Sequence, residues 1–112
     1  MSEPEQTSGD NLIALDLSPF SRADLGKIAK LGDNLRLLYR WFRSERVTES
    51  GLDRYFLYSG ARGRTPYASY LVERHHDGRY RLMEQRQLTQ ICWGRTIEEV
   101  LKALPEDFYY SH

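Results

Sequence analysis

The spacing of the apolar residues changes along this 112-residue chain, from a helical repeat in its first half to alternation in its second. Between residues 25 and 42, apolar side chains recur at steps of three or four, which places them on one face of a helix. These side chains are Leu25, Ile28, Leu31, Leu35, Leu38 and Phe42. From Arg54 onward, tyrosine and branched side chains gather in short runs suited to strands. The two patterns together predict an α+β fold.

The expected helix has a clear start and an ambiguous middle. The Ser21 hydroxyl can accept the backbone amide proton of Asp24, and the Asp24 carboxylate favours the positive end of a helix. Farther along, residues 32–34 (Gly-Asp-Asn) can end one helix and start another. The stripe therefore predicts either one helix or a helix pair packed on the core. The other faces of this helical region are expected to be solvated, with Trp41 near Arg36, Arg40 and Arg43.

The second half of the chain predicts an antiparallel sheet of three or four strands. Residues 55–58 (Tyr-Phe-Leu-Tyr) and 67–72 (Tyr-Ala-Ser-Tyr-Leu-Val) are typical of strands, and the Gly-rich residues 59–66 separate them. A hairpin turn around Asp77 and Gly78 leads into the next strand, because this dipeptide tolerates positive backbone angles. Residues 88–93 are a candidate for the last strand.

Charge and hydrophobicity predict the register of this hairpin. A two-residue loop of Asp77 and Gly78 would place Arg74 opposite Arg81, and such a like-charge pair costs stability. A three-residue loop over residues 76–78, with Gly78 in the left-handed conformation, pairs Glu73 with Arg81 instead. The same register pairs Val72 with Leu82, Leu71 with Met83, and Arg74 with Tyr80. We therefore expect the three-residue loop.

The ends of the chain differ in what they can fold into. Residues 1–11 contain too few apolar side chains to offset the entropy of ordering, so we expect a flexible tail followed by a single domain over residues 12–112. Residues 12–17 suit an edge strand or an extended segment. Thr96 and Glu99 form a capping box, which predicts a short C-terminal helix ending before Pro105. The acidic and aromatic residues 106–112 either pack back on the domain or bind a partner.

Charge is balanced in total but not along the chain. The 16 basic and 16 acidic side chains cancel, yet residues 34–95 carry 12 basic and 6 acidic ones. Arginine supplies 13 of the basic side chains. Its planar guanidinium group binds carboxylates, phosphates and aromatic faces better than an ammonium group does, so the middle of the chain favours such partners.

Composition excludes several classes of protein. The single cysteine, Cys92, excludes an internal disulfide framework and a multi-cysteine zinc site. No apolar run reaches the length of a membrane span, and the acidic start does not suit a signal peptide, so we expect a cytoplasmic protein without membrane partners. No catalytic signature is present. We therefore expect a non-enzymatic domain without a cofactor, and a small-ligand pocket or an enzyme stays as the remaining alternative.

Two local motifs have both a chemical and a plain structural interpretation. Residues 60–65 (Gly-Ala-Arg-Gly-Arg-Thr) can hold an anion between Arg62 and Arg64, but they lack the spacing and the lysine of a P-loop, which favours a mobile connection. Residues 75–77 (His-His-Asp) contain metal-ligand types, yet neighbouring strand residues point to opposite faces, which favours a solvated turn. Cys92 lacks a nearby catalytic partner in sequence.

The strands combine five tyrosines with five arginines, and this combination leads our functional hypothesis. If helices cover one face of the sheet, the other face can present these groups to a protein partner or to a second copy. The alternative is nucleic-acid binding through Arg62 and Arg64 of the basic loop and the sheet arginines Arg79 and Arg81, with base stacking on the aromatic rings. The candidate binding residues are Arg62, Arg64, Tyr70, Arg74, Arg79, Tyr80 and Arg81.

Overall fold

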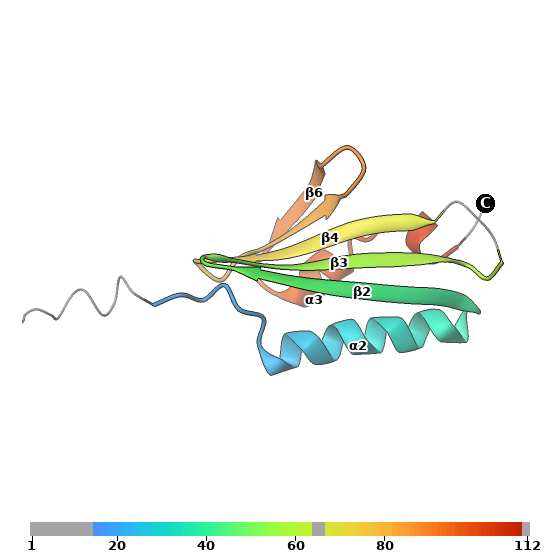
Figure 1. Ribbon diagram of the computed structural model, residues 1–112, viewed down its shortest axis with the longest axis horizontal. Coiled ribbons are helices and arrows are strands. Elements are labelled where there is room, and N and C mark those ends of the chain that lie inside the picture. Colours follow the sequence, from blue (N-terminus) through green and yellow to red (C-terminus); the bar gives the residue numbers. More distant parts are fainter. Residues whose placement is uncertain (1–14, 64–66, 111–112) are drawn as a thin grey trace, which may run out of the picture.

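The computed structural model describes residues 15–63 and 67–110. It confirms the α+β fold, in which one long helix packs against a five-stranded antiparallel sheet and a short helical segment follows (Figure 1). The strands lie in the sheet in their order along the chain, β2-β3-β4-β5-β6. The elements are α2 (Arg22–Leu37), β2 (Arg40–Glu49), β3 (Leu52–Ala61), β4 (Ala68–His75), β5 (Tyr80–Glu84), β6 (Thr89–Gly94), α3 (Ile97–Leu101) and the 3₁₀ turn η1 (Glu106–Phe108).

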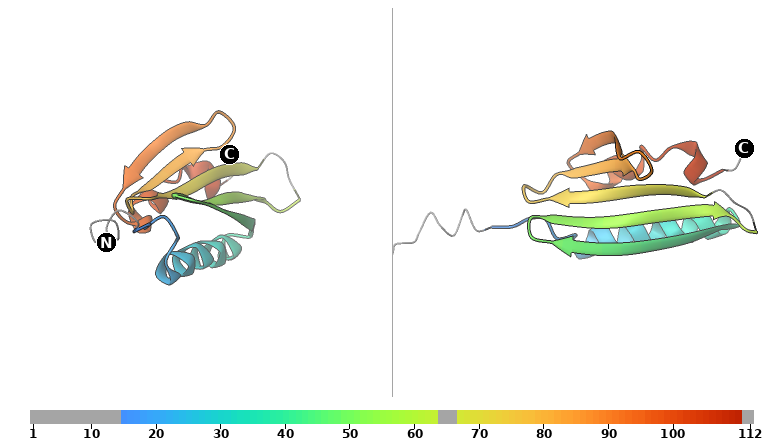
Figure 2. Two further views of the ribbon diagram at one scale, coloured as in Figure 1. Left: turned by 60° about the vertical axis from the view of Figure 1, so that its left-hand side comes forward. Right: turned by 45° about the horizontal axis from the view of Figure 1, so that its top comes forward.

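The helical segments α2, α3 and η1 all pack on one face of the sheet (Figure 2). Successive strand residues point to opposite faces, so alternate residues of each strand enter the core between the sheet and the helices. Leu57 of β3, Val72 of β4 and Leu82 of β5 are fully buried there. They meet side chains from all three helical segments, namely Ile28, Leu31, Leu35, Ile97, Val100 and Phe108.

The helix α2 is continuous, which resolves the choice between one helix and two. Ser21 and Asp24 form the expected capping box at its start. Gly32 lies inside the helix and is buried, where the ring of Phe42 packs against it. A Cβ atom at Gly32 would approach that ring to 2.7 Å. Close packing with Phe42, and not a break in the helix, therefore explains this glycine.

The strand β2 is the element that the sequence pattern did not predict. Phe42 continues the helical spacing, but the helix ends at Leu37 and residues 40–49 form a strand. The expected solvated helical face with Arg40 and Arg43 is therefore wrong. Both lie in β2, where Arg40 is buried and Arg43 is exposed. Tyr39 makes the connection possible by adopting a positive φ of 58°.

The hairpin of β4 and β5 has the predicted register. Glu73 lies opposite Arg81, Val72 opposite Leu82, and the loop spans residues 76–78. Gly78 has a φ of 85°, as the three-residue loop requires. The Arg81 guanidinium donates to the Glu73 carboxylate at 2.7 Å. The structure thus avoids the like-charge pair of Arg74 and Arg81.

Two buried carboxylates connect the start of α2 to the sheet. Besides capping the helix, Asp24 accepts hydrogen bonds from the Tyr80 hydroxyl at 2.8 Å and from the Arg74 guanidinium at 3.0 Å. Asp53 of β3 is fully buried and accepts hydrogen bonds from the Phe20 amide and from Arg46. The strand side chains thus hold α2 by directional bonds as well as by apolar contact.

The C-terminal segment packs back on the core. Phe108 is fully buried, and its ring meets those of Phe42 and Tyr70 edge-on. Its carbonyl oxygen accepts hydrogen bonds from the buried Arg40 at 3.1 Å and from the Ser59 hydroxyl at 2.6 Å. Of the two expectations for this acidic and aromatic segment, packing on the domain is correct for its described part.

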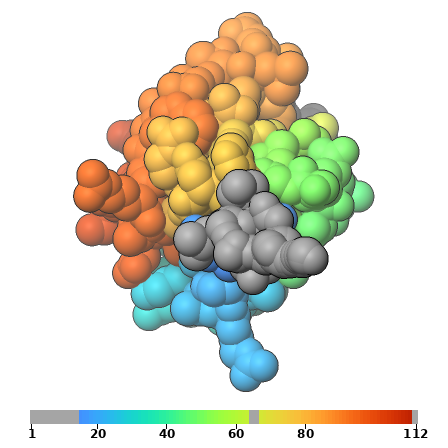
Figure 3. Space-filling view, turned by 90° about the vertical axis from the view of Figure 1, so that its left-hand side faces the viewer, coloured from blue at the N-terminus to red at the C-terminus, as the bar shows by residue number. Residues whose placement is uncertain are grey.

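One end of the sheet gathers two turns and the segment that precedes α2. The β2–β3 turn and the β4–β5 loop lie side by side there (Figure 3), and a Cβ atom at Gly51 would lie 3.8 Å from that of His76. The amide of Leu17 donates to the His76 carbonyl oxygen at 3.1 Å. Residues 15–17 are extended, without becoming a strand. The expected flexible tail, residues 1–11, lies outside the described residues.

Two glycines of α2 should respond in opposite directions to replacement by alanine. Gly26 has open space around it, so Gly26→Ala should raise the free energy of unfolding by up to about 1 kcal/mol through helix propensity. Gly32→Ala should lower it by about 1 kcal/mol or more, since the new methyl group clashes with Phe42. Urea denaturation of both variants measures the difference, and equal stabilisation by both would contradict the packing described for Gly32.

Candidate interaction site

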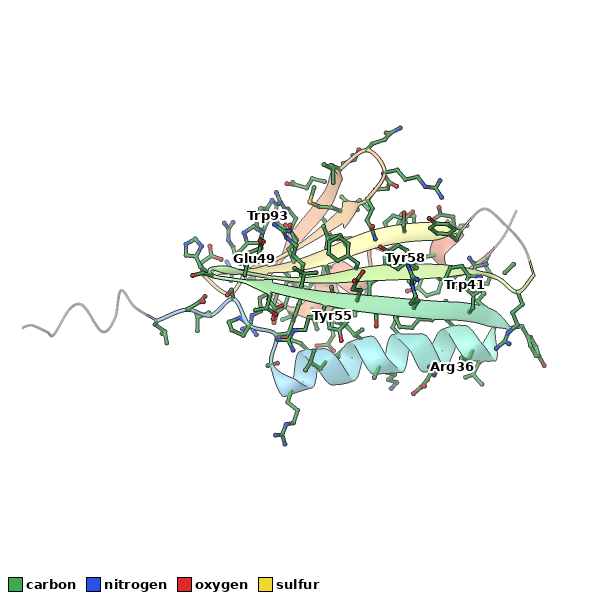
Figure 4. The ribbon with its side chains drawn as sticks, in the orientation of Figure 1. Arg36, Trp41, Glu49, Tyr55, Tyr58 and Trp93 are labelled. Carbon is green, nitrogen blue, oxygen red and sulfur yellow. The ribbon has the colours of Figure 1, made fainter. Side chains whose placement is uncertain are left out.

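The sheet face opposite the helices, which we call the open face, carries a mixed population of aromatic, basic and apolar side chains. The register assigns its residues by alternation. Trp41 and Tyr58 lie toward one end of this face, and Trp93 and Glu49 lie toward the other (Figure 4). Its aromatic and charged members are Trp41, Arg43, Glu45, Glu49, Arg54, Phe56, Tyr58, Tyr67, Glu73, His75, Arg79, Arg81 and Trp93.

Three aromatic rings from three chain segments form a cluster at one end of the open face. The ring centroid of Tyr67 lies 6.0 Å from that of Trp41 and 6.1 Å from that of Tyr58. Trp41 lies directly over Gly60 on the neighbouring strand, where a Cβ atom would approach the indole to 2.7 Å. The guanidinium of Arg43 stacks 4.7 Å from the centre of the Tyr58 ring. With 46% of its surface exposed, Tyr67 is open to a partner.

Trp93 organises a second cluster at the other end of the open face. The guanidinium groups of Arg79 and Arg81 lie 4.4 Å and 5.1 Å from its ring, and the His75 ring lies 4.8 Å away. Trp93 is 37% exposed. Contacts of a cation with an indole are worth about 0.5–1 kcal/mol at exposed sites. They hold both arginines in place before any partner binds.

A single carboxylate neutralises much of the charge at this end. Glu73 is only 4% exposed and is bonded by Arg81, at 2.6 Å, and by His75, at 3.0 Å. The guanidinium of Arg54 lies 3.7 Å from it and also pairs with Glu49 at 3.1 Å. These pairs cross four neighbouring strands, β2 to β5, so the charged groups reinforce the sheet.

The centre of the open face is apolar. Leu71, Phe56 and Met83 lie opposite one another on β4, β3 and β5. Leu71 is only 5% exposed although no helix covers it. Neighbouring side chains therefore shield it, as the stems of long side chains commonly do. The result is a partly apolar centre with an aromatic and basic cluster on each side.

The structure divides the predicted binding residues between the two faces. Arg79 and Arg81 lie on the open face, as expected. Tyr70 and Tyr80, each 5% exposed, point into the core, and Arg74 bonds to Asp24 on the same side. The prediction that Tyr70, Arg74 and Tyr80 form an exposed binding surface is therefore wrong, because alternation places all three on the face that the helices cover.

The predicted basic loop is only partly described. Arg62 follows β3 and is exposed, whereas Arg64 lies outside the described residues. Arg62 is at the end of β3 next to the start of β2, while Arg79 and Arg81 are near the opposite end of the sheet. The structure thus does not bring Arg62 together with the sheet arginines into one site.

The predicted binding residues did not include Tyr58 and Tyr67 of the open face, and the sequence analysis also did not place Trp41, Arg43 and Trp93 there. Trp41 and Arg43 were missed because the helical spacing was extended into β2. The signal for Trp93 was available, since alternation within a strand places it on the face opposite its neighbour Cys92, which the β5–β6 register sets opposite the buried Leu82.

The other motifs have structural roles. Asp77 accepts hydrogen bonds from the backbone and side chain of Arg79, and His75 stacks on Trp93. Among the described residues, no group of three histidine, cysteine or acidic side chains is placed to hold a metal ion. Burial, and secondarily Glu99, raises the pKa of Cys92, which keeps this thiol protonated and poorly nucleophilic.

One hollow of about 430 Å³ lies between the β5–β6 turn and Pro105. It is open to solvent, and most of its lining side chains are polar, including Tyr70, Glu84 and Arg86. This differs from the enclosed apolar cavity with a few converging polar groups that is typical of small-ligand sites. The hollow therefore lacks the enclosure of a typical small-ligand site.

Comparisons with known proteins add no assignment. No family model, no curated protein sequence and no solved structure matches this chain. Among the described residues, no helix is both long and apolar enough to cross a lipid bilayer.

Tyr80 should behave as a core residue with a distinctive pH dependence. Burial, together with the bond to Asp24, raises the pKa of Tyr80 to about 12. Tyr80 therefore stabilises the fold fully below the ordinary tyrosine pKa of 10.0 and loses this contribution as the pH rises through about 12. Tyr80→Phe should lower the free energy of unfolding at pH 7 by about 1.5–3 kcal/mol, as for a bond to a charged group.

The same variant should lose less stability than the wild type between pH 10 and pH 12. Urea denaturation at both pH values measures this difference. An unchanged free energy of unfolding at pH 7 would contradict the buried bond to Asp24, and parallel losses in alkali would contradict the raised pKa.

Proposed function

We propose that this protein is a small non-enzymatic interaction domain that binds a protein partner through the open face of its sheet. The observation that carries this proposal is the pair of aromatic clusters with arginines already stacked on their rings, at an uncovered face. Tryptophan, tyrosine and arginine are the residue types most enriched at the energetic centres of protein interfaces. The rings offer large contact areas and lose little side-chain entropy on binding.

The charge arrangement favours a protein over a nucleic acid as the partner. Arg81 and Arg54 are paired with Glu73, and Arg79 is paired with Asp77. Phosphates would have to compete with these carboxylates, and Glu45 and Glu49 on the same face would repel a polyanion. A protein surface with apolar side chains and a few carboxylates fits better, because it matches the apolar centre and the exposed edges of the guanidinium groups.

The experiment that tests this proposal compares wild type with the double variant Tyr67→Ala and Trp93→Ala. The immobilised wild-type chain is used to capture a partner from the lysate of its native cell, the partner is identified and purified, and its Kd is measured by calorimetry. We expect the double variant to bind at least about tenfold more weakly, since two exposed anchors are removed.

The matched control is Leu37→Ala, which removes an exposed apolar side chain, 79% accessible, at the end of α2. It should leave the Kd unchanged, and thermal unfolding should show that all variants are folded. Equal affinity of the wild type and the double variant would refute the open face as the binding site. Capture of RNA or DNA, abolished by moderate salt, would favour the nucleic-acid alternative instead.

A further inference from the structure

The edge strand β2 has properties that the proposed function does not use. It is ten residues long, every residue from Arg43 to Glu49 is exposed, and among residues 15–63 and 67–110 it pairs with β3 alone. The opposite edge strand, β6, has six residues and its pairing is interrupted by a bulge next to Leu82. Bulges and short strands are common protections against pairing with another chain, and β2 has neither.

The backbone of β2 is oriented to accept another strand. Glu49 and Leu52 flank a two-residue turn, and such flanking residues form a hydrogen-bonded pair. The amide and carbonyl groups of the odd-numbered residues of β2 therefore point toward β3. Those of the even-numbered residues, with Ser44 at their centre, point away from the sheet and toward solvent.

The helix leaves room beside this edge. On the side of β2 that faces the helices, Arg40 and Phe42 are covered, whereas Ser44, Arg46 and Thr48 are exposed. Arg40 binds the Phe108 carbonyl of η1 and Phe42 packs on Gly32 of α2, so the second half of β2 has the more exposed side chains on this side. In an antiparallel pair related by a two-fold axis through Ser44, the covered half of each strand would lie beside the uncovered half of the other.

The charges of β2 favour the register centred on Ser44 over the two registers next to it. With Ser44 opposite Ser44 of a second copy, Arg43 lies opposite Glu45 and Glu45 opposite Arg43 on the open face. A shift of two residues in one direction would place Glu45 opposite Glu45, and a shift in the other direction would place Arg43 opposite Arg43. Like charges directly opposite destabilise a pair, so both shifted registers are disfavoured.

We propose that β2 pairs antiparallel with β2 of a second copy of this chain, centred on Ser44, to form a continuous ten-stranded sheet. The same register places Trp41 opposite Val47 on the open face, and sets the exposed Tyr39 beside Glu49. Since the two-fold axis is perpendicular to the sheet, the open faces of both copies lie on the same side. The guanidinium of Arg43 can stay stacked on Tyr58 and donate to Glu45 through its free edge.

A charge exchange tests the pairing without any other partner present. Sedimentation equilibrium should show a reversible dimer for the wild type. Arg43→Glu alone and Glu45→Arg alone should each raise the dimer Kd by about tenfold or more, because each substitution sets like charges opposite at two positions. The double variant, with both substitutions, should restore a Kd close to that of the wild type. A wild type that remains monomeric at high concentration would overturn the proposal, as would a double variant no better than the single ones.

Cysteine cross-linking tests the register independently. In a Cys92→Ser background, Ser44→Cys should form a disulfide-linked dimer on oxidation, since a hydrogen-bonded pair has Cα atoms about 5.5 Å apart, within the range for a disulfide. Val47→Cys is the matched control on the same exposed strand. Its two copies would lie about 20 Å apart along the strands, so it should not cross-link.

The outcomes separate this inference from the proposed function. Cross-linking through Ser44→Cys and not through Val47→Cys supports the stated register, and the reverse pattern overturns it. Thermal unfolding of each variant shows whether it folds. Replacement of Trp93, which lies on the open face away from β2, should not affect the dimer Kd, whereas it should affect binding of the protein partner.

Discussion

Within the described part of the chain, helices cover one of the two faces of the sheet, and this asymmetry decides the role of the strand residues. A side chain that alternates toward α2, α3 and η1 enters the core, and its neighbour on the strand must face solvent or a partner. Apolar contact alone would let a helix slide over such a face. The buried bonds of Asp24 and Asp53 oppose this, because each carboxylate must keep specific donors on the opposite layer. Burial would raise the pKa of Asp53, but its hydrogen bonds hold that pKa below its usual value, so this carboxylate stays charged.

Local signals in the sequence predicted the local structure well. Both capping boxes and the β4–β5 register follow from side chains within a few residues of each other, and the structure contains all three. The strand β2 was not predictable in this way, because Leu35, Leu38 and Phe42 keep a helical spacing across the end of the helix. Contacts beyond the local sequence distinguish the two arrangements, namely the packing of Phe42 against Gly32 and the pairing of β2 with β3.

The sequence predicted that aromatic and basic residues gather on the sheet, but it did not predict correctly which of them share the open face. The correct register already shows that Tyr70 and Arg81 cannot share a face, since alternation places Tyr70 with Val72 and Arg81 with Glu73. It does not show which face the helices cover, because both faces carry apolar pairs at this point, Val72 with Leu82 and Leu71 with Met83. That choice depends on where α2 and α3 dock, which no short stretch of sequence encodes.

An interface of pre-stacked arginines also loses less conformational entropy on binding than one of free side chains.

The burial of Phe108 has a consequence for the order in which the protein folds during synthesis. This ring fills the core beside Phe42 and Tyr70, and its carbonyl oxygen is bonded to Arg40 from the first sheet strand. Residues more than sixty positions apart must therefore meet before the core is closed. Until the ribosome has released the chain as far as Phe108, the emerging sheet exposes apolar surface on the side of the helices. Nascent chains that have not yet exposed Phe108 are thus more prone to aggregation, and more dependent on chaperones, than the closed domain.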